Sequence, residues 1–165
     1  MSAARPKAGL VLRRATLSDA GPVWQCRQAL LDSSAIQTSA SDEPFETHVA
    51  WFSCAVNDSV RLFLIIEKDS NWLGYLRFDP QDTNDGYRVS IALHADARGS
   101  GMGRAALMDG CARAELAGFT PLFADISVTN QASRRIFEKC GFIPLGSEPS
   151  SEGFQRFMRE RQSYP

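Results

Sequence analysis

The chain has 165 residues, of which 18 are basic and 19 acidic, and it is 44% hydrophobic and 22% charged. This length suits one folded unit, so we expect a single domain over residues 1–165. A net charge of −1 excludes a global field that would attract nucleic acid or anionic lipid, and no apolar run approaches the roughly 18 residues of a membrane span.

The N-terminal residues and the cysteines predict a reduced, cytoplasmic protein. Residues 1–9 carry two positive charges but no apolar segment, which argues against a secretory signal and predicts a disordered start. The cysteines are widely spaced without a C-x-x-C pair, so we expect mostly buried thiols and no metal site. They are Cys26, Cys54, Cys111 and Cys140.

The first part of the chain predicts one short strand and two helices. In chain order they cover residues 11–14, about 19–31 and about 44–56. Thr16 or Ser18 can cap the first helix, whereas Asp42 can cap the second, with Pro44 in its first turn.

Antiparallel strands are expected next. Residues 61–67 and 72–78 have strong strand patterns, and the polar turn at 68–71 joins them into a hairpin. Turn residues at 84–86 then favour pairing of a third strand, 87–93, with this hairpin.

The remaining chain predicts alternating helices and strands. They are a helix over 102–117, a strand over 121–128, a helix over 131–140 and strands over 142–145 and 154–158. Gly118 and Gly141 can end the two helices in the left-handed conformation. The expected fold class is therefore α/β (α+β), with a mixed, mostly antiparallel sheet of six or seven strands and about four helices.

The glycine-rich segment from Arg98 to Gly103 lies between a predicted strand and a predicted helix. Glycines let backbone N–H groups converge, and a helix start adds unpaired amides and a positive end, so this turn predicts a phosphate site. No Lys-Ser or Lys-Thr follows the glycines, which disfavours a Walker A loop. The dinucleotide fingerprint has a different glycine spacing, although Asp125 at the ribose-binding distance keeps that alternative open.

The run Arg98-Gly99-Ser100-Gly101-Met102-Gly103 resembles the R/Q-x-x-G-x-G/A signature of the GNAT superfamily of N-acetyltransferases. Residues 125–142 are similar to the same family's N-x-x-A-x-x-x-Y-x-x-x-G-F segment, with Asn130 at its start and Gly141-Phe142 at its end. Together with the element order, the resemblance covers nearly the whole chain. It implies an enzyme that transfers the acetyl group of acetyl-CoA to an amine.

The resemblance also implies a set of coenzyme contacts. Backbone amides would hold the pyrophosphate, and these belong to Arg98, Gly99, Ser100, Gly101, Met102, Gly103 and Arg104. Leu93 and Ala95 would flank the pantetheine arm, while Asn130 and Ser133 would contact the coenzyme from the following helix. Asn130 is also suited to cap that helix. Arg134, Arg135 or Lys139 could meet the phosphates or lie on solvated surface.

Phe137 departs from the family pattern. Many relatives have Tyr at the matching position, where its hydroxyl protonates the departing thiolate, so the resemblance places Phe137 beside the coenzyme but leaves the acid unassigned. Water or the Ser133 hydroxyl could serve, because a thiol with a pKa near 8.5 is a tolerable leaving group.

The remaining catalytic roles are assigned to the central strand. For the base, Ser90 could relay a proton through water and His94 could titrate near neutral pH, with Glu67 and Asp79 as further candidates. The Leu93 backbone is expected to stabilise the oxyanion.

The acceptor is expected between the first two helices and the strand ends. His48, Trp51 and Phe52 form an H-x-x-W-F pattern similar to that of relatives that acetylate amino-sugar nucleotides in pseudaminic-acid-type pathways. We therefore expect His48, Trp51 and Tyr87 at the substrate, with simple helix packing as the alternative for His48 and Trp51.

The favoured acceptor is a small-molecule amine. A homodimer is compatible with the sequence, and neither nucleic acid nor membrane is expected as a partner. The alternatives are acetylation of a protein N-terminus or lysine, a non-catalytic acyl-CoA-binding module, and a dinucleotide oxidoreductase.

Overall fold

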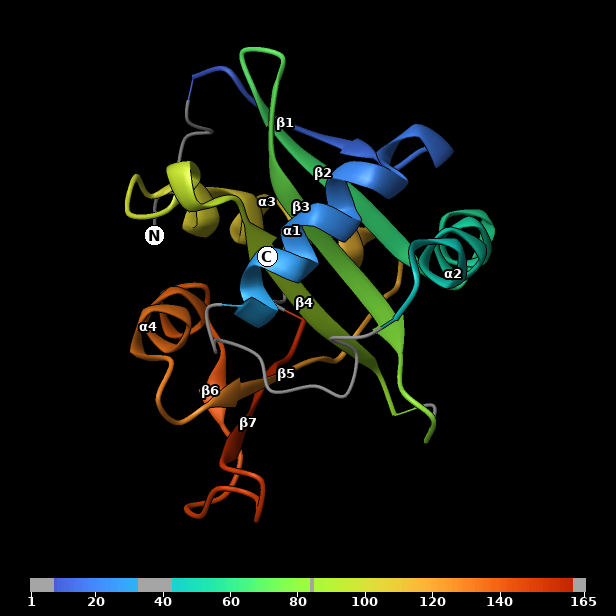
Figure 1. Ribbon diagram of the computed structural model, residues 1–165. Helices are drawn as coiled ribbons and strands as arrows, with labels where there is room; N and C mark the ends of the chain where they lie inside the picture. Colours follow the sequence, from blue (N-terminus) through green and yellow to red (C-terminus); the bar gives the residue numbers. More distant parts are fainter. Residues whose placement is uncertain (1–7, 33–42, 84, 162–165) are drawn as a thin grey trace.

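The computed structural model describes residues 8–32, 43–83 and 85–161, and these form one mixed, mostly antiparallel sheet with helices on both faces (Figure 1). The strands are β1 (Leu10–Arg14), β2 (Leu62–Lys68), β3 (Asn71–Pro80), β4 (Tyr87–Leu93), β5 (Leu122–Ser127), β6 (Ile143–Pro144) and β7 (Phe154–Arg159). The helices are α1 (Ala20–Asp32), α2 (Phe45–Asn57), α3 (Met102–Leu116) and α4 (Gln131–Lys139), with short 3-10 turns η1 (Leu17–Asp19) and η2 (Ala95–Ala97). The sheet order is β1-β2-β3-β4-β5-β7-β6.

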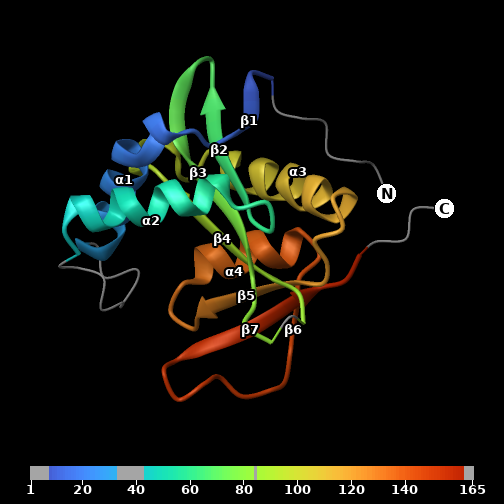
Figure 2. The same cartoon turned by 90° about the vertical axis from the view of Figure 1, so that its right-hand side faces the viewer.

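Two hydrophobic clusters hold the three layers together, one on each side of the sheet. Helices α1 and α2 cover one face and α3 and α4 the other (Figure 2). Because successive strand residues point to opposite faces, Phe63 and Ile65 of β2 pack toward α1 and α2, while Leu64 and Ile66 pack toward α3. No helix within the described ranges is long and apolar enough to cross a bilayer.

The predicted hairpin and meander are confirmed. Asp69 and Ser70 both have positive φ, 49° and 66°, which is the backbone of a tight two-residue hairpin turn between β2 and β3. Strand β3 then pairs antiparallel with β4 from Gly74–Leu93 to Pro80–Tyr87. This antiparallel arrangement contradicts the dinucleotide fold, which needs a parallel sheet.

Some boundaries differ from the expectation. The strand predicted over 142–145 is reduced to Ile143–Pro144, because Phe142 turns into the core and is only 2% exposed. The first helix is preceded by η1, where the Asp19 carboxylate accepts a hydrogen bond from the Thr16 backbone N–H at 2.8 Å. The predicted cap Asp42 and most of the expected disordered start, residues 1–7, lie outside the described residues.

Strands β4 and β5 separate soon after they meet. They are the one parallel pair within the described sheet, and they pair only at Tyr87–Leu122 and Arg88–Phe123. Beyond these rungs β4 continues to Leu93, whereas β5 continues to Ser127 in pairing with β7. The middle of the sheet is therefore open toward the C-terminal ends of β4 and β5.

Candidate functional site

The loop between β4 and α3 forms a cradle of backbone amides. Gly99 and Gly101 have left-handed φ values of 73° and 76°, and Gly101 is the N-cap of α3. The Ser100 hydroxyl donates to the Ala97 carbonyl at 2.8 Å, which holds the turn together. The amides that follow Gly101 belong to the first helical turn, where no preceding turn can accept from them. Such a loop suits an anion with several oxygens.

The start of α3 lies tightly against its neighbours. A Cβ built on Gly103 would lie 2.9 Å from Cδ1 of Leu93 and 3.5 Å from Cδ1 of Ile136, so a larger residue would have to displace the Leu93 side chain. A Cβ on Gly99 would meet nothing within 4 Å, so the surface of the cradle is open. The loop therefore fits a pyrophosphate: it is rigid beneath and unobstructed above.

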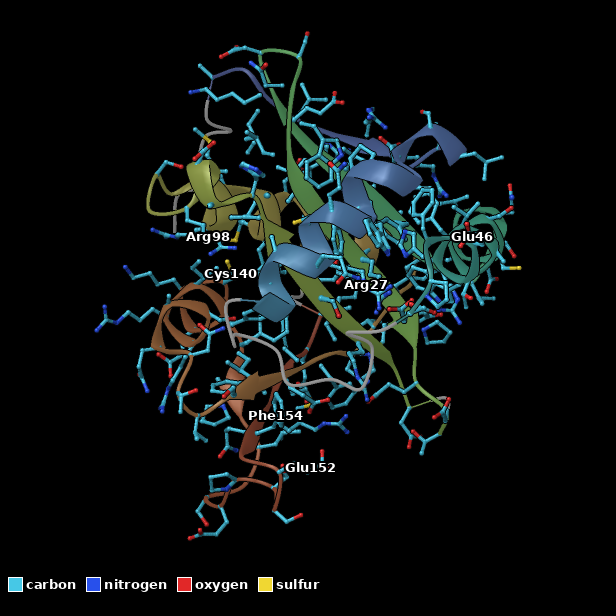
Figure 3. The ribbon with its side chains drawn as sticks, in the orientation of Figure 1. Arg27, Glu46, Arg98, Cys140, Glu152 and Phe154 are labelled. Carbon is cyan, nitrogen blue, oxygen red and sulfur yellow. The ribbon has the colours of Figure 1, made fainter. Side chains whose placement is uncertain are left out.

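The end of β4 presents backbone amides toward the open part of the sheet. The Tyr87 N–H donates toward β5, to Pro121 at 2.9 Å, whereas the His94 N–H donates toward β3, to Leu73 at 2.8 Å. Since hydrogen-bonding directions alternate along a strand, the N–H groups of Ile91 and Leu93 point to the β5 side, where pairing has ended. The Leu93 carbonyl accepts from Arg98 Nε at 3.2 Å, which anchors the cradle to the strand end. Figure 3 labels Arg98 on the loop before α3, on the side of α4.

Helix α4 borders the cradle. Asn130 caps it, because its Oδ1 accepts from the Ser133 N–H at 3.0 Å. The exposed cations of this region are Arg98, Arg104, Arg135 and Lys139, whereas Arg134 is held by Glu138 at 2.8 Å. Within the cradle Met102 is buried, so only its backbone can serve a ligand.

Phe137, which the family pattern implied to lie beside the coenzyme, is a buried residue of α4. Its side chain is 3% exposed and packs edge-to-face on Phe142, with the ring centroids 4.9 Å apart. It belongs to the core cluster between the sheet and α3. Its apolar ring therefore contributes to the core, and it carries no group that could donate a proton.

These features were compared with known proteins. Residues 9–143 match the acetyltransferase (GNAT) domain family. The chain belongs to the GNAT acetyltransferase family. It is therefore an acetyl-CoA-dependent N-acetyltransferase, and the cradle and the open end of β4 form the candidate donor site of this GNAT enzyme.

Solved structures have the same fold. Spermidine N-acetyltransferase from Vibrio cholerae, in complex with CoA and spermine, has a TM-score of 0.78 at 14% identity, over 92% of this chain and 94% of that one. The protein yncA from Salmonella typhimurium, with its cofactor acetyl-CoA, has a TM-score of 0.77 at 20% identity, over 93% and 94%. Ribosomal-protein-alanine N-acetyltransferase from Brucella melitensis has a TM-score of 0.75 at 20% identity, over 90% of this chain and 96% of that one. The search among curated proteins found no match.

His48 is enclosed in this GNAT enzyme, in contrast to its expected place at the substrate. It has no exposed surface, its Nε2 lies 3.0 Å from the Ala20 carbonyl, and its Nδ1 lies 3.2 Å from Arg27 Nη1. The partners require Nε2 to donate and Nδ1 to accept, which is the neutral ring. Burial lowers the pKa of His48 further below its usual value. Its structural role is to join α1 to α2 and to orient Arg27.

Trp51 lies at the edge of the α1/α2 layer. Two guanidinium groups flank its ring, Arg27 at 5.3 Å and Arg77 at 5.1 Å from the centroid. Trp51 therefore lies near the sheet face that carries Ser90, because Arg77 is the cross-strand partner of Ser90.

Tyr87 lies on the other face of the sheet, which corrects its expected grouping with Trp51. Its ring stacks on Phe119 with 4.6 Å between centroids, in the α3 cluster. The strand alternation that places Ser90 on the α1/α2 face places Tyr87, three residues earlier, on the opposite face.

The four candidates for the general base differ in whether other residues already bind their side chains. Glu67 accepts from Arg13 at 2.8 Å, and Asp79 lies between Arg61 and Arg77, 2.8 Å from each. Both carboxylates are thus already held by cations. His94 is exposed and caps η2 through Asp96. Ser90 is half-buried on β4, at the first position of its face beyond the last rung with β5.

A set of charged residues on the same face as Ser90 was not apparent from the sequence. They are Arg61, Arg77, Arg88 and Arg156, with Asp79 and Asp125 between them, and we call them the arginine row. The spacing Arg77-x-Asp79 and Arg88-x-Ser90 on polar strand faces was a visible signal, but only the strand order brings these residues together.

Proposed function

We propose that this GNAT enzyme moves the acetyl group of acetyl-CoA to a primary amine of a small molecule, by direct attack in a ternary complex. The observation that carries the proposal is the separation of β4 from β5, with the amide cradle and α4 on one side of the gap and Ser90 on the other face. Donor and acceptor can therefore reach the gap from opposite faces of the sheet. A direct transfer needs this arrangement.

The bound coenzyme supplies an activated acetyl thioester. The acceptor nitrogen forms a bond to the carbonyl carbon, the carbon–sulfur bond breaks, the amine loses one proton and the thiol leaves with one. Negative charge develops on the carbonyl oxygen during the attack. The fixed N–H groups of Ile91 and Leu93 are suited to stabilise it, since prearranged donors need little reorganisation.

Ser90 is the candidate that supports proton removal best among those expected. Its position beyond the last β4–β5 rung and its half-buried side chain suit a relay from the amine through water to solvent. The Ser133 hydroxyl or water stays the proposed proton source for the thiolate, because Phe137 has no ionisable group.

We favour a small-molecule acceptor over a protein N-terminus or a lysine because the arginine row provides a polar surface beside Ser90. A sugar-linked amine is not supported by the H-x-x-W-F pattern, because His48 and Phe52 are buried packing residues. Such amines still belong in a substrate panel. A cytoplasmic location and a homodimer remain predictions from the sequence.

The test combines ligand binding with turnover. Thermal-shift measurements with acetyl-CoA, coenzyme A, NAD and ATP should give stabilisation by the first two alone, because a ligand above its Kd stabilises the folded state. Thiol release across a panel of primary amines then separates an enzyme from a non-catalytic binding module. Stabilisation by coenzyme A with no thiol release for any amine would overturn the catalytic proposal.

Two glycine variants form a matched pair for the cradle. Gly99 and Gly146 have nearly equal left-handed φ, 73° and 74°, and a Cβ on either meets nothing within 4 Å. Gly99→Asp adds a negative charge to the cradle, so coenzyme affinity should fall at least about tenfold, whereas Gly146→Asp should leave it unchanged. Equal affinities in the two folded variants would contradict the assignment of the cradle.

A further inference from the structure

The arginine row crosses four strands on the α1/α2 face of the sheet. Cross-strand register places Arg77 opposite Ser90, Asp79 opposite Arg88, and Asp125 opposite Arg156. Arg88 is also the last residue of β4 that pairs with β5, where its partner is Phe123. The row therefore runs directly beside the point at which the two strands separate.

The carboxylates of the row are shared, so guanidinium groups are left with spare donors. Asp125 receives both Arg88, at 3.3 Å, and Arg156, at 2.9 Å. A single negative charge thus faces two positive charges. Arg156 also donates to Gln81 Oε1 at 2.9 Å, so the spare donors lie mainly on Arg88, whose five N–H groups share one carboxylate with Arg156.

Arg77 also shares its carboxylate with a second arginine. Its Nε lies 2.8 Å from Asp79 Oδ2, but the angle is unsuitable for a hydrogen bond, and this buried N–H has no other acceptor. Asp79 is already hydrogen-bonded by Arg61 at 2.8 Å. The buried Nε is out of reach of a ligand, and Arg61 has a second carboxylate, Asp58, at 3.0 Å, so the surplus positive charge of the row lies at Arg88 and Arg156.

Part of the row is exposed within the described ranges. Figure 1 shows α1 and α2 over the β1–β4 half of this face, while β5 and β7 have no helix on the same side within the described chain. The side chains of Arg88 and Arg156 are 55% and 41% exposed, whereas that of Asp125 is 30% exposed. The positive partners are thus more accessible than the carboxylate they share. Trp51 borders the row through Arg77.

We infer that the row binds an anionic group of the acceptor, a carboxylate or a phosphate, and so selects amines that carry such a group at a distance from the nitrogen. This inference rests on the proposed function. Arg88 is the principal contact, with Arg156 and Arg77 beside it, because guanidinium groups bind both kinds of anion with paired hydrogen bonds. The acceptor nitrogen then lies toward Ser90 and the open end of β4.

The spacing along β4 limits the length of the acceptor. Three residues separate Arg88 from Ile91, which corresponds to about 10 Å of strand. An amine adjacent to its own carboxylate is too short to occupy both places at once. The row therefore favours amines that are several bonds away from the anionic group, and it disfavours polycations, which two guanidiniums repel.

The experiment uses paired amines with the wild-type enzyme. Glycine, 6-aminohexanoate and 8-aminooctanoate are each compared with their carboxamides, 6-aminohexyl phosphate is compared with 6-aminohexanol, and spermidine represents polycations. We expect kcat/KM from thiol release to be higher for each longer anionic amine than for its neutral partner. The carboxylate and phosphate arms show which anion is preferred.

Arg88→Gln tests the contact itself. A hydrogen-bonded charge contact contributes enough that its loss should raise KM for the preferred anionic amine by about ten- to a hundredfold, with a change below about twofold for the neutral partner. Arg156→Gln should act in the same direction. Arg14→Gln, an exposed arginine on the distant edge strand β1, is the control and should change neither value.

Three results would overturn the inference. Equal or better turnover of the neutral partners or of spermidine would show that the row does not select anions while leaving the proposed function intact. Equal loss for acidic and neutral amines in Arg88→Gln, with coenzyme affinity retained, would show a general effect on the site. Thiol release with none of the amines would contradict the proposed function and, with it, the inference.

Discussion

Phe137 allows the missing general acid to be tested at a single position. Its ring is enclosed against Phe142, so the added hydroxyl in Phe137→Tyr would leave water for apolar surroundings. We expect the free energy of unfolding to fall by about 1–3 kcal/mol, with no rise in kcat. Urea unfolding and thiol release measure the two quantities. A higher kcat at unchanged stability would instead show that this ring faces the departing thiolate.

Single residues differ in how well their roles could be predicted. The roles of Gly99 and Gly101 follow from local backbone requirements, and Asn130 follows from its place before a helix, so sequence spacing was sufficient to predict their conformations. The burial of His48 and Phe137 depends on which helices and strands surround them. No local pattern distinguishes a buried His from one that contacts a substrate, because a residue on the inner face of a helix can do either.

Helix α3 approaches β3 so closely that one of its glycines is required. A Cβ on Gly110 would overlap Cδ2 of Leu76, a fully buried core residue, whereas a Cβ on Gly21 in α1 would meet nothing within 4 Å. Gly110→Ala should destabilise the protein by about 1–3 kcal/mol through overpacking. Gly21→Ala should stabilise it by about 0.5–1 kcal/mol, because Ala loses less entropy in a helix.

The comparison of these two variants by urea unfolding separates packing from helix propensity. Both replace a helical glycine by the same residue, so propensity alone predicts the same sign for both. A gain of stability in Gly110→Ala would show that α3 can move away from β3 without cost, and would contradict the close approach as a structural constraint.

At the level of elements, the sequence predicted strand β4 with its correct ends but not the direction of its faces. A period of two shows which residues share a face, as Arg88 and Ser90 do, but not which helices cover that face. Tyr87 was for this reason grouped with Trp51, although it lies on the opposite side of the sheet. The separation of β4 from β5 follows from no local pattern, since pairing depends on both strands.

At the scale of the whole molecule, the arginine row joins positions as far apart as Arg61 and Arg156. Arg61 lies just before β2, and the other members come from β3, β4, β5 and β7. Strand β7 lies beside β5 because the sheet order places it between β5 and β6. Each arginine alone has the sequence context of a solvated strand face. The row could not be predicted before the order of the strands was known, whereas the cradle could, because it lies within one continuous loop.

The C-terminal strand is joined to both helices of its face by one buried ion pair. Arg159 of β7 donates to Glu115 of α3 at 2.6 Å and to the Cys140 carbonyl at the end of α4, and both side chains are 5% exposed or less. Glu115→Gln leaves the guanidinium buried without its counter-charge, so the free energy of unfolding should fall by roughly 3 kcal/mol or more. Asp109→Asn, which breaks the exposed pair with Arg113 on the same helix, should cost less than about 1 kcal/mol. Urea unfolding of both variants compares them, and similar small losses would mean that β7 is held by its strand pairing and apolar contacts rather than by Arg159.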